Sequence, residues 1–224
     1  KPRGYFRQSL WSEKPMAYLG TYPVPEGRGR NRGPSVDAWS VWNYEEGQSI
    51  RVVCYTNAAS AKLLLNGELI GEPKNYDEKT GIIFWDIPYN DGKLEVVGMD
   101  ANGKQVSQYS IQSSGRPAGI KIISKETTIE KGRVAQVILQ VVDENGIPVM
   151  LSDDEITCRI NGDLHLLGLE ASNNSDMSDY TDNQQRVFHG RLVAYIRAGE
   201  TTGEFTAQFS ANWLKSAETK IIVQ

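Results

Sequence analysis

The chain is poor in the residue types that build metal centres, thiol chemistry and membrane spans. Its 224 residues include two cysteines and two histidines. Neither His165 nor His189 has a cysteine or a second histidine at ligand spacing, which argues against a zinc site and against a Cys–His nucleophile pair. No apolar run reaches the roughly 18 residues that a membrane helix needs. The sequence therefore predicts no bound metal, no cofactor and no contact with a membrane.

An excess of positive charge is also missing. Lysine and arginine number 24 against 28 acidic residues, so the formal net charge is −4 at pH 7. This balance lacks the basic footprint of a nucleic-acid-binding protein. The arginine- and glycine-rich residues 26–34 contain no aromatic side chain, and we interpret them as a solvated linker.

The two cysteines lie far apart, in apolar segments of different predicted domains. Two interpretations stay open for Cys54 and Cys158: they are either buried free thiols or partners in a disulfide between the domains. Their redox state, and with it the redox compartment, is not decided by the sequence.

What the sequence does contain is a succession of short, apolar or alternating segments separated by Gly, Asn and Asp. Such a pattern is typical of antiparallel β-sandwiches, and helical periodicity is hard to find beyond residue 25. Asn66-Gly67 is the strongest hairpin signal. The predicted strands are 36–44, 49–56, 61–65, 82–87, 93–99 and 105–111, and then 119–124, 127–130, 134–142, 155–161, 185–198, 203–211 and 219–223.

This pattern divides the chain into two sandwich domains and an N-terminal segment of different character. Residues 1–25 combine a short helical stretch with an extended one and form that segment, and 26–34 form a linker. The first β-sandwich module covers 35–112, a breaker-rich linker covers 113–118, and the second module covers 119–224. The predicted fold class is all-β, with two antiparallel immunoglobulin-like β-sandwich domains.

Several motifs, in this order, carry a resemblance to a known family. The opening K-P-R-G-Y-F-R-Q-S-L-W-S-E-K-P-M resembles the end of the catalytic (β/α)8 barrel in bacterial glycoside hydrolase family 2 enzymes, β-galactosidases in particular. The motifs W-N-Y-E-E-G-Q (42–48), V-C-Y-T-N (53–57) and L-L-L-N-G (63–67) resemble the sandwich module after that barrel, with Tyr44 where the family usually has tryptophan. The segment 134–149, then L-L-G-L-E-A-S-N-N (166–174) and F-H-G-R-L-V-A-Y-I (188–196), resembles the C-terminal immunoglobulin-like module.

The resemblance covers nearly the whole chain and identifies residues 1–25 as the tail of the catalytic barrel. It implies a retaining glycosidase whose two catalytic glutamates lie in the barrel, upstream of this sequence. No glutamate here matches either motif, so no catalytic residue is assigned, and the isolated chain is expected to be inactive. Glu45 and Glu46 are neighbours on one predicted strand, so they point to opposite faces and cannot flank one glycosidic bond.

Tryptophans are the residues to examine for carbohydrate binding, because an indole ring stacks on the apolar face of a pyranose. Trp42 is the candidate substrate-binding residue, since its predicted strand places it on the opposite face from Trp39, although a structural role is the favoured interpretation of all five tryptophans. Trp85 and Trp213 are interpreted as core residues. Trp11 belongs to the barrel-like segment, where the fragment exposes a face that the parent enzyme covers.

The polar loop 173–182 gathers oxygen ligands of the kind that calcium prefers, but it lacks the spaced Asp-x-Asp-x-Asp-Gly pattern of a calcium loop. We interpret it as a long polar sandwich loop, and calcium binding stays open. A chelator that lowered the melting temperature would favour the ion.

Three hypotheses for function remain. The first is a pair of non-catalytic accessory modules of a β-galactosidase-like glycoside hydrolase, with the catalytic barrel of the parent chain as partner and a periplasmic or cell-surface location. The second is an independent carbohydrate-binding module, and the third is an immunoglobulin-like adhesion or scaffold fragment. The barrel-like residues 1–16 favour the first hypothesis, because neither alternative needs them.

Overall fold

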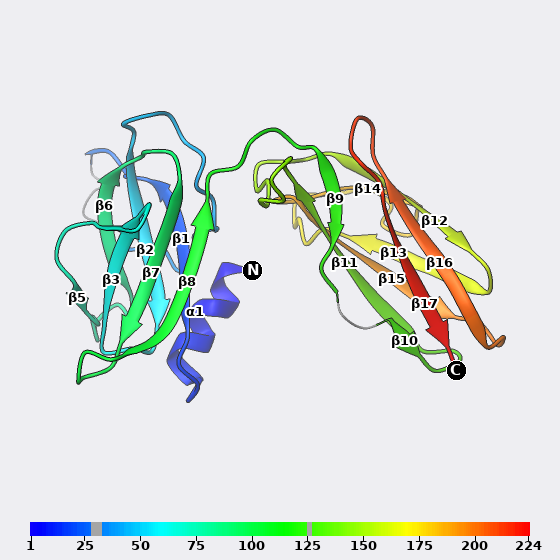
Figure 1. Cartoon of the computed structure of the whole chain (residues 1–224), viewed down its shortest axis with the longest axis horizontal. Coiled ribbons are helices and arrows are strands. Elements are labelled where there is room, and N and C mark those ends of the chain that lie inside the picture. The colour runs from blue at the N-terminus through cyan, green and yellow to red at the C-terminus, as the bar shows by residue number, and fades with distance from the viewer. Residues whose placement is uncertain (28–32, 125–126) are drawn as a thin grey trace. The chain divides into compact units, whose positions relative to one another are not determined.

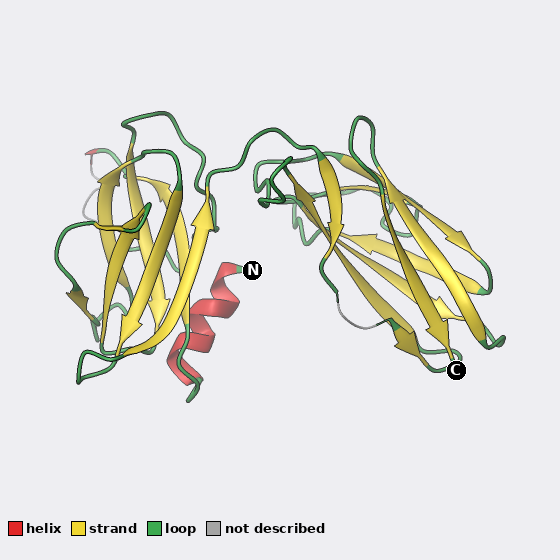
Figure 2. Ribbon diagram, in the orientation of Figure 1, coloured by secondary structure: helices red, strands yellow, loops and turns green. Residues whose placement is uncertain are grey.

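The computed structural model describes residues 1–27, 33–124 and 127–224, and it divides into two compact units, Lys1–Ser113 and Ser114–Gln224 (Figure 1). In the described residues nearly all regular structure is strand, with one α-helix at the N-terminus (Figure 2). Each unit contains two sheets around an apolar core. The predicted all-β fold with two sandwich domains is confirmed. Residues 28–32 of the predicted linker 26–34 lie outside the described part of the chain.

The first unit pairs a three-stranded sheet with a five-stranded one. The smaller sheet has the order β1 (Ala17–Pro23), β2 (Ser49–Thr56), β6 (Ile83–Pro88). The larger has the order β4 (Glu68–Leu69), β3 (Ser60–Leu65), β7 (Lys93–Met99), β8 (Gln105–Gln112), and β5 (Lys74–Asn75) pairs with β3. Alternate residues of each strand face inward because the side-chain period of a strand is two. Their core includes Leu19, Trp42, Ile50, Val52, Cys54, Leu63, Trp85, Leu94 and Val96.

The N-terminal segment is built into this first unit. Helix α1 (Pro2–Trp11) lies against β1 and β2, and β1 pairs with β2 along its whole length, from Ala17 opposite Thr56 to Pro23 opposite Ile50. The predicted boundary after residue 25 is therefore wrong for the strand, which belongs to the sandwich. Sequence patterns missed this because the pairing partner of β1 lies far along the chain.

Residues 36–44 do not form the predicted strand. They run beside β1 as an irregular segment, in which the carbonyl of Trp39 accepts the Thr21 N–H at 2.9 Å. Gly20 makes this approach possible, because a Cβ at that position would collide with the carbonyl oxygen of Ala38. The alternation of large residues resembles that of a strand. The segment is held instead by side-chain hydrogen bonds and by its close approach to Gly20, without the hydrogen-bond ladder of a strand pair.

The second unit is also a sandwich. Its sheets have the orders β10 (Thr128–Ile129), β17 (Ala217–Val223), β16 (Gly203–Ser210), β12 (Glu155–Asn161), β14 (Gln184–Arg186), and β13 (Leu164–Glu170), β15 (Arg191–Ala198), β11 (Val134–Val142), β9 (Gly119–Ile122). All pairs are antiparallel except β10 with β17. The predicted strand 185–198 is two strands, because His189 and Gly190 adopt positive φ values and reverse the chain between Phe188 and Arg191.

The predicted linker 113–118 is tied down within each unit. The backbone N–H of Ser113 donates to the carbonyl of Gly92 at 3.0 Å, inside the first unit. The N–H of Gly115 donates to the carboxylate of Asp143 at 2.8 Å, and the N–H of Ala118 donates to Val142 at 2.9 Å, both inside the second. The division between the units falls between Ser113 and Ser114.

Candidate functional site

The outward face of the β1–β2–β6 sheet carries a stack of aromatic rings under α1. Tyr5 of α1 stacks on Tyr18 of β1 at 4.4 Å between ring centroids, and Tyr18 stacks on Tyr55 of β2 at 5.4 Å. Phe6 meets the ring of Tyr55 edge-on at 5.5 Å. Burial raises the pKa of Tyr18 and of Tyr55, so both hydroxyl groups stay protonated and act as donors. This stack fixes α1 to the sheet.

Asn57 ties the chain after α1 to the end of β2. Its amide nitrogen donates to the carbonyls of Ser12 and Lys14 at 2.8 and 2.9 Å. Its side-chain oxygen accepts the backbone N–H of Met16 at 2.9 Å. One side chain thus satisfies the hydrogen bonding of three backbone groups in the segment between α1 and β1, and it fixes the path of that segment.

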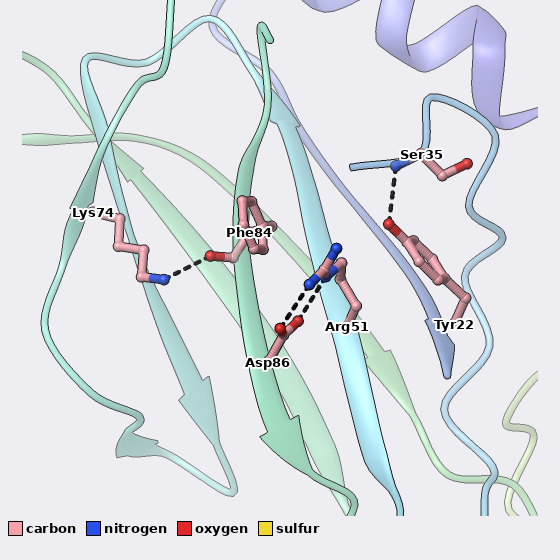
Figure 3. Close-up of polar contacts among 6 residues, drawn as sticks. All are labelled: Tyr22, Ser35, Arg51, Lys74, Phe84 and Asp86. Carbon is pink, nitrogen blue, oxygen red and sulfur yellow. Dashed lines mark hydrogen bonds and ion pairs between the residues drawn. The ribbon is translucent and has the colours of Figure 1, made fainter. Parts of the chain in front are cut away.

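An arginine lies almost wholly buried on the same sheet. Arg51 of β2 is 5% exposed and stands opposite Asp86 of β6 in the strand register. Its Nε and one terminal nitrogen donate to the two carboxylate oxygens at 2.7 and 2.8 Å (Figure 3). The guanidinium also lies 4.7 Å from the centroid of the Phe84 ring. The hydrogen bonds to Asp86 are the largest cause of the raised pKa of Arg51.

The neighbours of this ion pair are tied to the backbone. Lys74 Nζ donates to the carbonyl oxygen of Phe84 at 2.8 Å, and the hydroxyl of Tyr22 accepts the backbone N–H of Ser35 at 2.9 Å (Figure 3). The bidentate pair with Asp86 occupies the two guanidinium N–H groups with which Arg51 would bind a carboxylate or phosphate ligand. The cluster is therefore a cross-strand structural pair and offers no anion site.

Trp42, the predicted substrate-binding residue, lies inside the core of the first unit. It is 1% exposed, and its ring meets those of Tyr89 and Tyr44 edge-on at 5.0 and 6.2 Å. A buried indole cannot stack on a sugar, so this burial contradicts the predicted role. Trp85 is buried as expected. The indole N–H groups of Trp42 and Trp85 have no hydrogen-bond partner among the described residues.

Two tryptophans are instead on the surface. Trp11, on α1, is 77% exposed, as the sequence suggested. Trp213, which we expected in the core, is 100% exposed in the turn between β16 and β17. The apolar neighbour Leu214 misled the prediction, because Leu214 packs on the core of the second unit while Trp213 turns outward.

Comparisons with known proteins match both units. The family profile described as glycoside hydrolase family 2 C-terminal domain 5 matches residues 120–220, and a profile described as a domain of unknown function (DUF4982) matches residues 47–107. The chain is 24% identical over 220 residues to the β-galactosidase BoGH2A of Bacteroides ovatus. The aligned residues cover 97% of this chain and 23% of that protein.

Residues 120–220 thus match a C-terminal domain of glycoside hydrolase family 2, and the whole chain is similar to proteins of that family.

Two further similar proteins are glycosidases by name. The crystal structure of a β-glycosidase from Bacteroides vulgatus is 29% identical, with a TM-score of 0.82 over 97% of this chain and 26% of that one. A β-glucuronidase of Formosa agariphila is 28% identical over 133 residues, which cover 58% of this chain and 14% of that protein. The chain thus spans about a quarter or less of the length of these relatives.

The motifs that carry the family resemblance have structural roles. Trp42 fills the core, Asn57 clamps the segment after α1, and Asn66 and Gly67 form the turn between β3 and β4 with positive φ values. His189 and Gly190 form the turn before β15. These motif residues therefore stabilise the fold.

The carboxyl groups with a shifted pKa in the described residues do not have the environment of a glycosidase acid. A general acid needs a raised pKa, but every described Asp or Glu with a resolved shift has a lowered one: Asp77, Glu95, Asp143, Asp163, Asp176 and Asp179. The causes are hydrogen bonds from nearby backbone and side-chain groups. In the described part of the chain, these groups are held as carboxylates.

The acidic loop 173–182 turns its carboxylates on its own backbone. Asp176 accepts the N–H of Ser178 at 2.9 Å, and Asp179 accepts the N–H of Thr181 at 2.9 Å. No three metal-ligating side chains gather in the ranges that the structure describes. In the same ranges, no helix has the length and apolar character to cross a bilayer.

The two cysteines are buried free thiols in separate units. Burial raises the pKa of Cys54 to about 12 and that of Cys158 to about 12. Thiolate is the reactive form, so neither residue is a nucleophile near neutral pH. Of the two interpretations that the sequence left open, the structure favours free thiols.

Proposed function

We propose that this chain forms non-catalytic accessory modules of a family 2 glycoside hydrolase and that α1 docks the first unit onto the catalytic part of the same protein. The observation that carries the proposal is the outward side of α1. Trp11 is 77% exposed there, although the opposite side of the helix is fixed to the sheet. Such a side chain is suited to the centre of an interface, where tryptophan and arginine dominate binding.

The outward side of α1 has the composition of a docking surface. Arg3, Arg7 and Trp11 follow one another at a spacing of four residues, so they form one row along the helix. All three are exposed, and Arg3 makes an ion pair with Asp37 at 3.2 Å. A ten-residue helix is marginal on its own. The tyrosine stack holds it on one side, and we assign the other side to the catalytic part.

The parent protein would hydrolyse β-glycosides by the retaining mechanism of two carboxylates, both supplied by the catalytic part. β-Galactosides are our first choice of substrate, because the Bacteroides ovatus relative carries that name, and β-glucuronides are the second, because the Formosa relative carries that one. A periplasmic or cell-surface location in a bacterium completes the proposal, and fractionation of expressing cells tests it.

Hydrogen–deuterium exchange tests the docking directly. Backbone amides of α1 should exchange at least about 10-fold more slowly in the full-length protein than in the 224-residue chain, because docking adds protection. Trp11→Ala should remove most of that protection, whereas Trp213→Ala, which changes an equally exposed indole elsewhere, should leave it unchanged. Equal exchange of α1 in the two proteins would refute the docking role.

A further inference from the structure

Trp213 is placed where neither packing nor backbone preference explains a tryptophan. Its side chain is 100% exposed, whereas Trp42 and Trp85 are 1% and 3% exposed. Its φ is +66°, in the left-handed region that favours glycine or asparagine over large side chains. The indole adds exposed apolar area and the backbone adds strain of about 1 kcal/mol or more. A strained residue that the fold does not need is a candidate for a functional one.

The turn that carries Trp213 is held firmly. Leu214 packs on the core of the second unit, next to the exposed indole in sequence. Lys215 is bridged to the start of β9: its N–H donates to the carbonyl of Ala118 and its carbonyl accepts the N–H of Ile120, both at 2.9 Å. The ring is thus presented on a fixed backbone. A ligand that stacks on it would lose little of its binding free energy to ordering of the protein.

The surroundings of the indole decide which ligand it fits. Asn212, Lys215 and Ser216, which flank it in the turn, are all exposed and polar. Protein interfaces surround a tryptophan with further apolar and aromatic contacts. A pyranose ring, in contrast, offers one face of C–H groups with hydroxyl groups around its edge. A single exposed indole with exposed polar residues beside it in the turn complements that pattern.

We infer that Trp213 is a glycan-contact residue, on which a pyranose ring of a polysaccharide stacks while Asn212, Lys215 and Ser216 face the hydroxyl edge. This inference goes beyond the docking role, which needs no sugar contact in the second unit, and it rests on the proposed function only for the choice of glycans. Sugar bound here would be held outside the catalytic part.

Affinity electrophoresis of the 224-residue chain in gels containing soluble β-galactan or xyloglucan tests the inference. The wild-type chain should be retarded by at least one of these glycans. Trp213→Ala should weaken the apparent affinity by about 10-fold or more, the loss expected for a central stacking residue. Trp213→Phe should retain part of the retardation, and Trp11→Ala should retain all of it.

Two outcomes would overturn the inference. One is retardation of the wild-type chain and Trp213→Ala to the same extent, or of neither. The other is concentration-dependent dimerisation in sedimentation velocity that Trp213→Ala abolishes, which would assign the indole to contact with a second copy. A melting temperature of Trp213→Ala equal to that of the wild type shows that the variant is folded. Either failure leaves the exchange protection of α1, and hence the docking proposal, untouched.

Discussion

Replacement of Trp42 by alanine is the most informative single change in the first unit. The side chain is 1% exposed and packs among core residues of both sheets. Truncation of such a residue costs the transfer free energy of the indole and leaves a cavity, together about 3–5 kcal/mol. For a unit of this size the melting temperature should fall by roughly 10–25 °C. Trp42→Phe should cost only about 1–2 kcal/mol, because no hydrogen bond of the indole N–H is lost.

Urea unfolding followed by circular dichroism measures these differences, with Trp213→Ala as the matched control. That variant removes an indole that touches no core, so its free energy of unfolding should stay within about 0.5 kcal/mol of the wild type. If Trp42→Ala were as stable as the wild type, or if Trp213→Ala were the more damaging change, the assignment of core and surface would be wrong.

Three other predictions test separate parts of the structure. Gly20→Ala should lower the free energy of unfolding by about 1–3 kcal/mol, since the new Cβ meets a backbone carbonyl, whereas Gly4→Ala, with open space around it in α1, should raise it by about 0.5–1 kcal/mol; urea titrations that ranked them the other way would contradict the close crossing. Asp143→Asn should destabilise the second unit by about 1–3 kcal/mol at pH 7. Burial opposes the charge of Asp143, but hydrogen bonds from four backbone N–H groups outweigh burial and lower its pKa. The stabilisation is therefore present above the ordinary carboxyl pKa and is lost as the pH falls through the pKa of Asp143 in the folded chain. Melting temperatures measured against pH should show the wild type converging on the variant in acid. Iodoacetamide at neutral pH should label Cys54 and Cys158 only after unfolding, and mass spectrometry that found either labelled in the folded chain would contradict its burial.

Much of the fold was predictable because strands leave local signals. The segments 49–56, 93–99, 134–142 and 155–161 coincide with β2, β7, β11 and β12, since β-branched residues and turn residues mark both their middles and their ends. The Asn66-Gly67 turn was predictable for the same reason.

Features that depend on distant partners were not predictable. The pairing of β1 with β2 joins segments that lie far apart in the sequence. No strand was predicted where β13 lies, and the burial of its residues does not alternate regularly. Residues 36–44 alternate like a strand, but their path is set by the missing side chain of Gly20.

The surface residues were the hardest to predict. Sequence alternation cannot tell which of two opposite faces is inward, so Trp42 stayed a candidate for substrate binding, although it lies in the core. The sequence A-N-W-L around Trp213 resembles the end of a buried strand, but Trp213 has a positive φ in the turn and its side chain is exposed. The sequence gives no sign of the role of Asn57, because the two carbonyls and the one N–H that its side-chain amide binds lie far from it in the sequence.

Turnover of aryl β-galactosides and aryl β-glucuronides, measured side by side for the 224-residue chain and for the full-length protein, tests the division between support and catalysis. We predict hydrolysis by the full-length protein and a rate equal to buffer for the chain, in whose described residues the carboxyl groups with a shifted pKa are all held ionised. Hydrolysis by the chain that disappears when one of its own carboxylates is changed to an amide would contradict the account.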